Sequence, residues 1–536
     1  MTSISPAPVA TAFLPRKKLP IGLQTLAGLL DDGCYYADKS GYAVDLAVAG
    51  KYYFLSRPRR FGKSLFLDTL KELFEGNARL FRGLAAETRW NWSRQHPVIR
   101  ISFGAGVAKT KAELAQRIQE ILRTNRERLG LPRPADWPEV DTAGNLSHLI
   151  RQAHQTTGQP AVVLIDEYDK PILDNITDSA TALDMREGLK DLYSVLKDAD
   201  ADLKFVFITG VSKFSKVSLF SGLNNLKDIT LDARYSALCG YTDADVDTVF
   251  APELPGLDRE EIRRWYNGYN WLGESVYNPF DLLLLFDFRE FKPYWFETGT
   301  PTFLVKLLAD KRQFTPDIGC IVASDSLLST FDVDHIPVEA LMFQAGYLTI
   351  ASARRLPGRL QLSLKYPNLE VQASLNDSLL QYLTANALAV GNQAVALYDL
   401  LLANDWPGLK ALFHAFFASI PHDWYRNSPI AQYEGYWASI FYSYFASLGL
   451  DIRLEDTTNH GRIDMAVLFN GHVYIFEFKV VELVPEGQAL QQIKDKSYAD
   501  KYRQRGVPIH LIGVEFSKDN RNVVGFEVET LRLPQS

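Results

Sequence analysis

Three short apolar runs constrain the fold most strongly, because each is too short for a typical helix and too apolar for an exposed strand. They span Tyr52–Leu55, Ala161–Ile165 and Phe205–Thr209, and they are rich in β-branched and aromatic residues without alternation. Such runs are typical of parallel strands that are buried on both faces. Helical patterns lie between them, at Leu65–Phe74 and Met185–Leu196. Strands that alternate with helices predict an α/β core with helices on both faces of a parallel sheet.

The length of 536 residues predicts about three domains. We expect residues 1–18, which are rich in proline, to form a flexible N-terminal arm, and residues 19–240 to form the α/β core. Residues 241–400 read as helical segments joined by loops, and they predict a mostly helical lid or linker. Residues 401–536 return to a mixture of helix and strand, which predicts a second α/β domain.

Composition narrows the class of protein. Hydrophobic residues make up 47% of the chain and charged residues 23%, as in an average globular protein. The longest aliphatic run, Leu282–Leu285, is far too short to span a bilayer, and no signal peptide is recognisable, so we expect no membrane partner. Cys34, Cys239 and Cys320 form no CxxC pair, which favours the cytoplasm. The net charge of −7 restricts nucleic-acid binding to a local basic surface.

The segment Phe54–Leu70 has the layout of a phosphate-binding loop. A strand leads into Gly62-Lys63-Ser64, and a helix follows. Backbone N–H groups at the start of such a helix bind phosphate oxygens, Lys63 would reach the β- and γ-phosphates, and Ser64 would ligate Mg²⁺. Arg57 stands where the usual pattern has its first glycine. Taken alone, the motif is equally compatible with a basic turn that binds nothing.

A second strand, which ends in two carboxylates, supports the phosphate-binding interpretation. The segment Pro160–Asp169 places Asp166 and Glu167 at the end of a buried strand. Ligands of open parallel sheets bind at this edge. Asp166 would position Mg²⁺, and Glu167 would orient and polarise the attacking water.

A predicted hairpin near the C-terminus brings together two carboxylates. Asn470-Gly471 is a strong signal for a two-residue type I′ turn. The register that follows from this turn places Asp464 opposite Glu477, with Lys479 on the same face of the strand. Two facing carboxylates repel unless a cation lies between them, so the hairpin predicts a Mg²⁺ or Mn²⁺ site suited to phosphodiester hydrolysis. An edge strand with a solvated face is the alternative interpretation.

Two helical segments flank this hairpin. Glu434 lies on the segment Ile430–Leu448, next to its apolar face, and we expect its carboxylate to point toward the sheet. The segment Glu486–Arg503 predicts one helix with a basic face, which could follow a nucleic-acid backbone. An ordinary solvated face explains the same basic pattern equally well.

From Leu19 onward the chain resembles the AAA-ATPase-like proteins that carry a C-terminal PD-(D/E)XK nuclease domain. The resemblance is strongest in the P-loop segment and in the Asp464 and Glu477-Phe478-Lys479 set. The form RPRRFGKS is itself typical of that family, so Arg57 fits the pattern. The remaining segments that carry the resemblance are LPIGLQ (Leu19–Gln24), YYADKS (Tyr35–Ser40), LIDEYDKPI (Leu164–Ile172), FITGVSKFSKVSLFSGLNNLKDIT (Phe207–Thr230), WYNGY (Trp265–Tyr269), YNPF (Tyr277–Phe280), GYLTI (Gly346–Ile350) and YPNLEV (Tyr366–Val371).

The resemblance implies an ATPase core followed by a restriction-endonuclease-like domain, and hence an ATP-dependent or ATP-regulated nuclease with DNA as substrate. Glu434 and Gln492 fit the family's flanking helices. The rival hypothesis is a nucleotide-driven switch or oligomerisation module whose C-terminal domain only binds nucleic acid or a protein; a homo-oligomer is compatible with both hypotheses. The expected nucleotide-binding residues are Arg59, Arg60, Phe61, Gly62, Lys63, Ser64, Leu65 and Asp166. The expected metal ligands are Ser64, Asp166, Asp464 and Glu477. The expected catalytic residues are Glu167, Glu434, Asp464, Glu477 and Lys479.

Overall fold

The computed structural model describes residues 15–132, 141–213, 219–220, 223, 225–298, 304–305, 308, 321–324, 328, 337–384, 387–418, 434–458, 461–517, 519–520 and 522–531, without the side chains at 383–392, 434–438 and 455–461. Most of the predicted N-terminal arm therefore lies outside the described residues. The chain divides into two compact units. Unit 1 comprises Met1–Thr298 with Val322–Asn368, and unit 2 comprises Gly299–Ile321 with Leu369–Ser536.

Unit 1 is built on a five-stranded parallel sheet in the order β2-β3-β4-β1-β5. The three strands predicted from apolar runs are β1 (Tyr52–Ser56), β3 (Ala161–Asp166) and β4 (Leu203–Gly210), and the prediction of parallel buried strands is confirmed. β2 (Val98–Ser102) and the short edge strand β5 (Lys227–Asp228) complete the sheet. The carboxyl ends of β1 and β3 therefore meet at one edge of the sheet.

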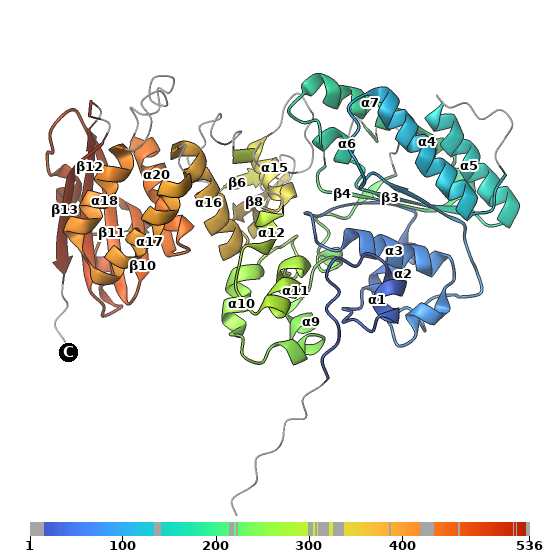
Figure 1. Ribbon diagram of the computed structural model, residues 1–536, viewed down its shortest axis with the longest axis horizontal. Helices are drawn as coiled ribbons and strands as arrows, with labels where there is room; N and C mark the ends of the chain where they lie inside the picture. The colour runs from blue at the N-terminus through green and yellow to red at the C-terminus, as the bar shows by residue number, and fades with distance from the viewer. Residues whose placement is uncertain are drawn as a thin grey trace, which may run out of the picture. The chain divides into compact units, whose positions relative to one another are not determined.

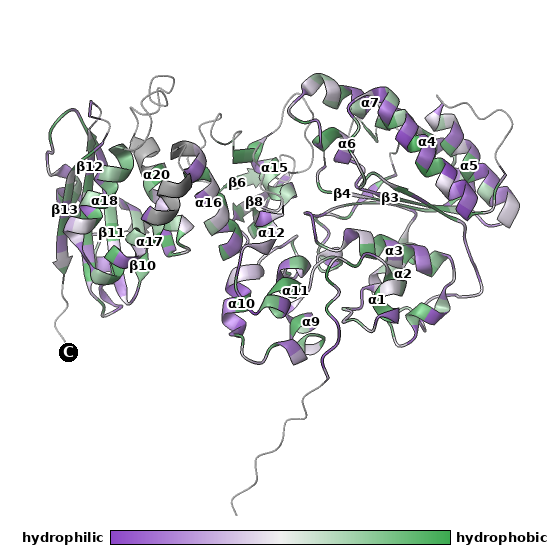
Figure 2. Cartoon of the chain, in the orientation of Figure 1, coloured by the Kyte–Doolittle hydropathy of each residue, from purple (hydrophilic) through white to green (hydrophobic). Residues whose placement is uncertain are grey.

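Helices cover both faces of this sheet, as expected for an α/β core (Figure 1). One face carries the longer helices α4 (Lys111–Arg128), α5 (Thr142–Thr157) and α7 (Ser179–Asp198). The other face carries helices from the N-terminal segment, namely α1 (Leu26–Asp31), α2 (Ser40–Ala49) and α3 (Lys63–Phe74). Hydrophilic and hydrophobic residues alternate along α4, α5 and α7, as in amphipathic helices with one face on the sheet (Figure 2).

The remainder of unit 1 is mostly helical, with one small sheet. Its helices are α9 (Asp243–Thr248), α10 (Arg259–Tyr266), α11 (Pro279–Phe288), α12 (Tyr294–Glu297) and α15 (Val338–Ala345). An antiparallel sheet with the order β6-β8-β7 follows, formed by β6 (Val322–Ser324), β7 (Thr349–Leu356) and β8 (Arg359–Lys365). Among the described helices, none has both the length and the apolarity needed to cross a bilayer.

Unit 2 is a mixed sheet between two layers of helices. The strand order is β13-β12-β11-β10-β9, from β9 (Asp451–Thr458), β10 (Gly461–Phe469), β11 (His472–Val481), β12 (Ile509–Ser517) and β13 (Asn522–Leu531). One face packs an aromatic-rich core against α17 (Ala387–Ala403), α18 (Trp406–Ala418) and α20 (Glu434–Ser447). α16 (Leu369–Thr384) packs on α20, and the opposite face packs on α21 (Gln488–Asp495) and α22 (Asp500–Arg503).

The single helix expected over Glu486–Arg503 is wrong, because the structure forms α21 and α22 with a turn between them. The break lies at Ser497, whose φ is +49°. Ile493, Tyr498 and Tyr502 all pack into the same core against the sheet. A continuous helix brings residues three or four apart onto one face, so the five-residue step from Ile493 to Tyr498 requires the turn.

A pair of histidines, of which His510 is buried, lies at one end of the sheet in unit 2. The Nε2 atom of His510 lies 2.7 Å from Nδ1 of His472, and its Nδ1 atom lies 2.9 Å from the Thr530 hydroxyl. The His510 ring also packs against Trp406, with ring centroids 4.7 Å apart. Burial, with the charge of His472 as a smaller cause, lowers the pKa of His510 to about 4.

This depressed pKa predicts an acid-sensitive unit 2. The unfolded chain protonates His510 near pH 6.5, whereas the folded chain does so only near pH 4, so stability is lost as the pH falls between these values. Between pH 7 and pH 4.5 the loss from this group should reach about 2–3 kcal/mol. We expect His510→Asn to remove this pH-dependent loss of stability. Urea unfolding should then show that the difference in free energy of unfolding between wild type and variant is about 2–3 kcal/mol smaller at pH 4.5 than at pH 7. His414→Asn, on an exposed position of α18, is the control. Parallel pH profiles for wild type and His510→Asn would contradict the assignment.

Candidate functional site

The turn between β1 and α3 has the geometry of a phosphate-binding loop. The backbone takes positive φ values at Arg60 (66°) and Gly62 (86°), and Gly62 is the N-cap of α3. Glycine adopts this left-handed conformation without strain, which explains its place directly before the helix. α3 then begins at Lys63, so the unsatisfied N–H groups of its first turn lie next to the loop.

Ser64 and Asp166 meet across the sheet edge, as the sequence predicted. The Ser64 hydroxyl donates a hydrogen bond of 2.6 Å to Oδ2 of Asp166. The other oxygen of Asp166, Oδ1, is buried and has no hydrogen-bond partner among the described residues. A buried carboxylate oxygen beside a hydroxyl is an oxygen-rich donor set of the kind that Mg²⁺ prefers, so these residues fit the ion.

Lys63 is buried next to this pair. Its Nζ atom donates hydrogen bonds to the carbonyl oxygens of Arg57 (2.9 Å) and Pro58 (2.8 Å). Burial lowers the pKa of Lys63, and the charge of Asp166 opposes that shift. The ammonium group is thus held at the loop by backbone oxygens.

Glu167 follows Asp166 in a strained backbone conformation. Its φ of +52° is rare for a residue with a side chain and commonly marks a functional site. Burial raises the pKa of Glu167, and the neighbouring Asp166 raises it further. A carboxylate whose pKa lies above its usual range is suited to accept a proton from water near neutral pH. Two residues later, Asp169 accepts hydrogen bonds from the backbone N–H (2.7 Å) and hydroxyl (2.6 Å) of Ser212, which tie this segment to the loop after β4.

Arg57 has a structural role in the loop. The side chain is fully buried, and its guanidinium donates hydrogen bonds to the carbonyl oxygens of Ser56 (2.9 Å), Thr230 (3.0 Å) and Tyr235 (3.1 Å). It also stacks over Trp271 at 4.0 Å from the ring centroid. Burial lowers the pKa of Arg57 to about 10, which leaves it charged at neutral pH. Arg57 therefore ties the loop to the segment that follows β5.

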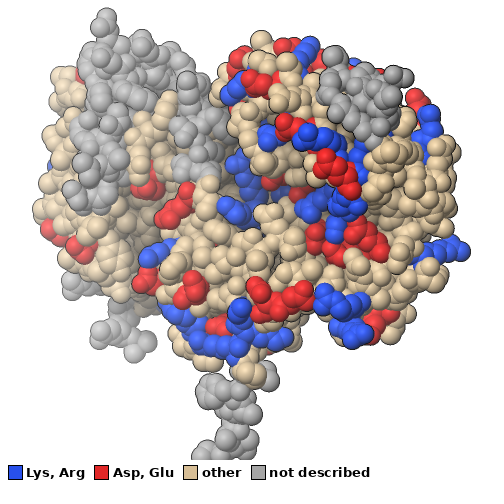
Figure 3. Space-filling view, turned by 45° about the vertical axis from the view of Figure 1, so that its right-hand side comes forward, with Lys and Arg blue, Asp and Glu red and all other residues tan. Residues whose placement is uncertain are grey.

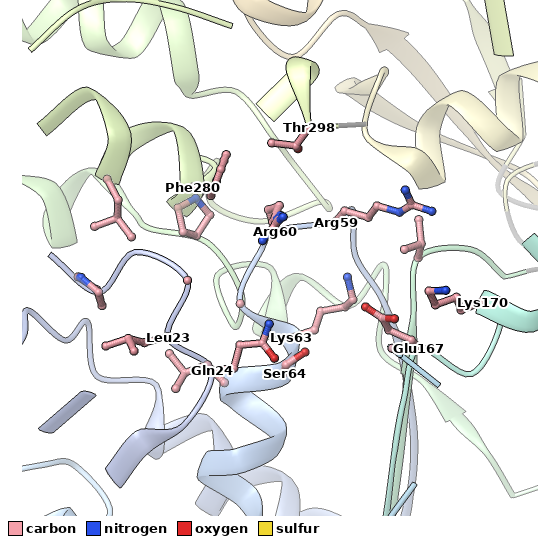
Figure 4. A pocket seen from close by; sticks show the side chains of 18 of the residues that line it. Leu23, Gln24, Arg59, Arg60, Lys63, Ser64, Glu167, Lys170, Phe280 and Thr298 are labelled. Carbon is pink, nitrogen blue, oxygen red and sulfur yellow. The ribbon is translucent and has the colours of Figure 1, made fainter. Parts of the chain in front are cut away.

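Lys63, Ser64, Glu167 and Asp169 line a cavity of about 460 Å³ in unit 1. Figure 4 shows Lys63 and Ser64 at the start of α3, across the cavity from Glu167 and Lys170, with Arg59 and Arg60 nearby. Arg60 stacks over Phe280 at 5.0 Å from the ring centroid. Phe61 and Asp166 are not lining residues, whereas the remaining predicted nucleotide-binding residues are. The rest of the wall is largely apolar, and its members include Pro20, Leu23, Leu65, Tyr241, Pro279, Phe280 and Leu283.

The hairpin in unit 2 has the predicted register up to Met465. Phe469 pairs with His472, and the ladder continues to Met465 opposite Phe476. The next predicted pair, Asp464 opposite Glu477, is absent from the ladder. Oδ2 of Asp464 instead accepts a hydrogen bond of 2.9 Å from the backbone N–H of Phe478. Two carboxylates directly opposite would repel each other, and this hydrogen bond gives Asp464 a different partner.

Glu477 is the buried centre of the second site. Its Oε1 atom accepts a hydrogen bond from the Gln492 side chain on α21, and Lys479 Nζ lies 3.4 Å away, which confirms that Glu477 and Lys479 share a face. Burial raises the pKa of the nearby Tyr498 phenol, with the charge of Glu477 as the next cause. Two carboxylates with a lysine offer oxygen ligands for a divalent ion, although the described residues contain no group of three or more acidic, His or Cys side chains arranged to hold one. The side chain of Glu434, the first residue of α20, lies outside the described residues.

Comparison with known proteins finds a separate family match for the part of the chain that carries each site. Residues 20–220 match the AAA-ATPase-like family, described as "Predicted AAA-ATPase", and residues 432–526 match the PD-(D/E)XK nuclease superfamily. A protein of Azotobacter chroococcum mcd 1, described as "Uncharacterized protein in vnfD 5'region", is 64% identical over 519 residues, which cover 97% of this chain and 100% of the relative. The chain belongs to the AAA-ATPase-like family that carries a C-terminal PD-(D/E)XK nuclease domain. No solved structure matches it.

Within this AAA-ATPase-like protein, several site residues were not singled out from the sequence. Asp169 lies two residues after the predicted acidic pair, and its position within LIDEYD was the available signal. The wall formed by Pro20–Gln24 and Phe280 comes from two segments that the family resemblance had marked without a role. Tyr498 had no signal beyond its place in the segment that also carries Gln492, since a lone tyrosine is more often a core residue.

Glu515 is a further buried carboxylate in the nuclease-like domain. It projects from β12 and accepts hydrogen bonds from four backbone N–H groups at the start of α21, those of Glu486 (2.6 Å), Gly487 (3.1 Å), Gln488 (2.7 Å) and Ala489 (3.3 Å). These N–H groups have no partners within the helix, and the negative charge matches the positive end of its dipole. Because α21 carries Gln492 to Glu477, Glu515 positions one wall of the second site.

We therefore expect Glu515→Gln to destabilise unit 2. In glutamine, an NH₂ group replaces one of the two carboxylate oxygens and cannot accept hydrogen bonds from the two backbone N–H groups that this oxygen served. Each buried donor left without an acceptor costs about 1–3 kcal/mol of stability. Urea unfolding should show a loss of about 2–4 kcal/mol. Glu527→Gln, at an exposed carboxylate on β13, should change stability by less than about 0.5 kcal/mol. Similar losses in the two variants would refute the capping role of Glu515.

Proposed function

We propose that the protein hydrolyses ATP in the cavity of unit 1 and uses this reaction to drive or regulate a metal-dependent nuclease in unit 2, with DNA as the substrate. The observation that carries the proposal is the meeting of Ser64 and Asp166 beside Lys63 and Glu167. Lys63, Ser64 and Glu167 line one cavity, and Asp166 is hydrogen-bonded to Ser64. A cation, a hydroxyl and two carboxylates are the groups needed for phosphoryl transfer.

The cavity suits a purine nucleoside triphosphate. Cations line one part of it, at Arg59, Arg60, Lys63 and Lys170, and would contact the phosphates. The apolar wall, with Leu23 and Phe280, would pack against the base, and the Gln24 amide offers both a donor and an acceptor to its edge. The volume of about 460 Å³ lies within the range of small-ligand sites.

Each residue then has a defined task in hydrolysis. Mg²⁺ held by Ser64 and Asp166 would neutralise charge on the β- and γ-phosphates. Lys63 would leave the carbonyl oxygens of Arg57 and Pro58 and donate to those phosphates. Glu167, whose raised pKa favours proton uptake, would orient water and accept its proton.

The second site supports phosphodiester hydrolysis on the same physical grounds. Asp464 and Glu477 would hold Mg²⁺ or Mn²⁺, which lowers the pKa of bound water. Lys479, 3.4 Å from Glu477, would orient that water or stabilise charge on the phosphate. Gln492 orients Glu477 through its hydrogen bond, and we propose that Glu434 adds a carboxylate.

The rival function is a nucleotide-driven switch whose C-terminal domain binds nucleic acid or a protein without cleaving it. It is favoured by one observation, that the described side chains supply two carboxylates rather than a complete cluster of three. Metal-dependent nicking of plasmid DNA by wild type and not by Asp464→Ala decides between the two functions.

The ATPase assignment predicts different effects for two substitutions. Lys63→Ala removes the positive charge that would contact the β- and γ-phosphates, and it should therefore abolish ATP binding or hydrolysis. Glu167→Gln leaves the binding groups intact and should keep nucleotide affinity while turnover falls about 10²–10⁴-fold. Calorimetric titration and phosphate release measure the two quantities, with Lys111→Ala, an exposed lysine paired with Asp184, as the control. Unchanged hydrolysis in both site variants would exclude the assignment.

The nuclease assignment predicts a link between metal and stability. Mg²⁺ or Mn²⁺ that binds only the folded state should raise the melting temperature of the wild-type chain. At a metal concentration of ten times the dissociation constant, the free energy of unfolding should increase by about 1.4 kcal/mol. Asp464→Asn should lose most of this increase and at least about 100-fold in cleavage, because it removes a charged ligand and keeps the shape. Both proteins carry Asp166→Asn, which removes the charged metal ligand of the first site. An equal metal-induced shift with and without Asp464→Asn would place the ion elsewhere.

A further inference from the structure

The β7–β8 hairpin of unit 1 lies in a segment without negative charge. Between Glu339 and Glu370 the sequence contains no Asp or Glu. It contains four cations, Arg354, Arg355, Arg359 and Lys365, all on β7 or β8. Charges of both signs are mixed over the face drawn in Figure 3, and the whole chain has a net charge of −7. A segment with only cations is therefore unusual in this protein.

The strand register places three of these cations on one face. Leu362 and Leu364 of β8 are buried and pair with Ala353 and Ile350, which defines the inner face of the sheet. The alternate residues form the outer face, with a β-bulge between Ile350 and Ser352 restoring the alternation on β7. The outer-face residues are Lys365, Ser363, Gln361 and Arg359 on β8, and Ser352, Arg354 and Leu356 on β7.

Arg354, Arg359 and Lys365 are exposed. Within the described part of the chain, Arg354, Arg359 and Lys365 form no ion pair and no side-chain hydrogen bond. Some other exposed arginines of unit 1 are paired, for example Arg79 with Asp31 (3.0 Å) and Arg123 with Glu127 (3.9 Å). Among the described residues, the outer face of the hairpin thus presents unneutralised positive charge, and it contains none of the residues of the two sites described above.

We infer that the outer face of the β7–β8 hairpin binds the phosphate backbone of a nucleic acid. This inference rests on the proposed function in so far as the substrate is DNA. Arginine and lysine side chains commonly supply the phosphate contacts of nucleic-acid-binding surfaces. The hydroxyl and amide groups of Ser352, Gln361 and Ser363 lie between the cations and suit phosphate and sugar oxygens better than acyl chains.

The helix expected to follow nucleic acid is a weaker candidate than this hairpin. That segment forms two short helices, and two of its cations are neutralised, since Lys494 pairs with Glu529 (2.5 Å) and Arg503 with Asp500 (2.6 Å). The hairpin would instead add a nucleic-acid contact in the same unit as the nucleotide cavity. The protein would then hold DNA with unit 1 while unit 2 carries the cleavage site.

The test uses the full chain with Asp464→Ala, in EDTA, so that DNA is bound and not cut. Fluorescence anisotropy with a labelled 30-base-pair duplex compares this chain with a hairpin triple variant, Arg354→Gln, Arg359→Gln and Lys365→Gln. The control triple, Arg79→Gln, Arg89→Gln and Arg123→Gln, changes the net charge equally at exposed, paired arginines. We expect the hairpin triple to lose at least about tenfold in affinity at 100 mM salt and the slope of log K against log salt to fall by about 2–3, with less than about threefold change in the control.

Several outcomes overturn the inference. Equal losses in both triples would mean that net charge alone acts, and unchanged binding in the hairpin triple would mean that DNA contacts another surface. If the hairpin triple keeps duplex binding and loses only binding to phosphatidylserine vesicles, the face is a lipid-binding surface. ATP binding by both triples verifies that unit 1 is folded. A wild-type chain that binds duplex through the hairpin and never nicks plasmid would refute the nuclease function and leave this inference intact.

Discussion

The parallel pairing of β1 and β3 on either side of β4 is the constraint on which the candidate nucleotide site depends. Parallel strands end at the same edge, so Ser64, which follows β1 in the chain, comes within 2.6 Å of Asp166 at the end of β3. About a hundred residues separate the two in sequence, and the sheet alone brings them together. Because β1, β3 and β4 are fully buried, apart from one exposed residue of β4, their register cannot slip without exposing apolar side chains.

The second site depends on a different constraint, the tight turn at Asn470-Gly471. The turn fixes the ladder from Phe469 to Met465, and it therefore brings Asp464 and Glu477 to the same end of the hairpin. From there the side chains decide the geometry. Asp464 turns to the Phe478 N–H, and Glu477 is held by Gln492 from a helix that Glu515 caps. Local turn chemistry thus sets the neighbourhood, and hydrogen bonds to more distant segments set the orientation.

This difference explains what sequence could predict. Short apolar runs predict the buried strands, and the two-residue turn predicts the hairpin register. The order of the two phosphate-site motifs along the chain predicts that Ser64 and Asp166 lie close together. The break at Ser497 could not be predicted, because the charged and polar residues around it fit one helix equally well and only the packing of Tyr498 and Tyr502 on the sheet requires two. Arg57 was also beyond prediction. Its sequence position suggests a solvent-exposed basic loop, whereas two of its three carbonyl partners come from a segment about 170 residues later.

The burial of Arg57 has a consequence for how the loop attracts anions. Arg59 and Arg60 are exposed, so dissolved ions screen their charges over about 10 Å at 0.1 M salt. Arg57 is fully buried yet remains protonated at neutral pH, and its field passes through protein of low polarisability rather than through electrolyte. The arginine that replaces a flexible glycine therefore gives this loop a fixed positive potential that ionic strength hardly weakens, in addition to the rigidity that its hydrogen bonds impose.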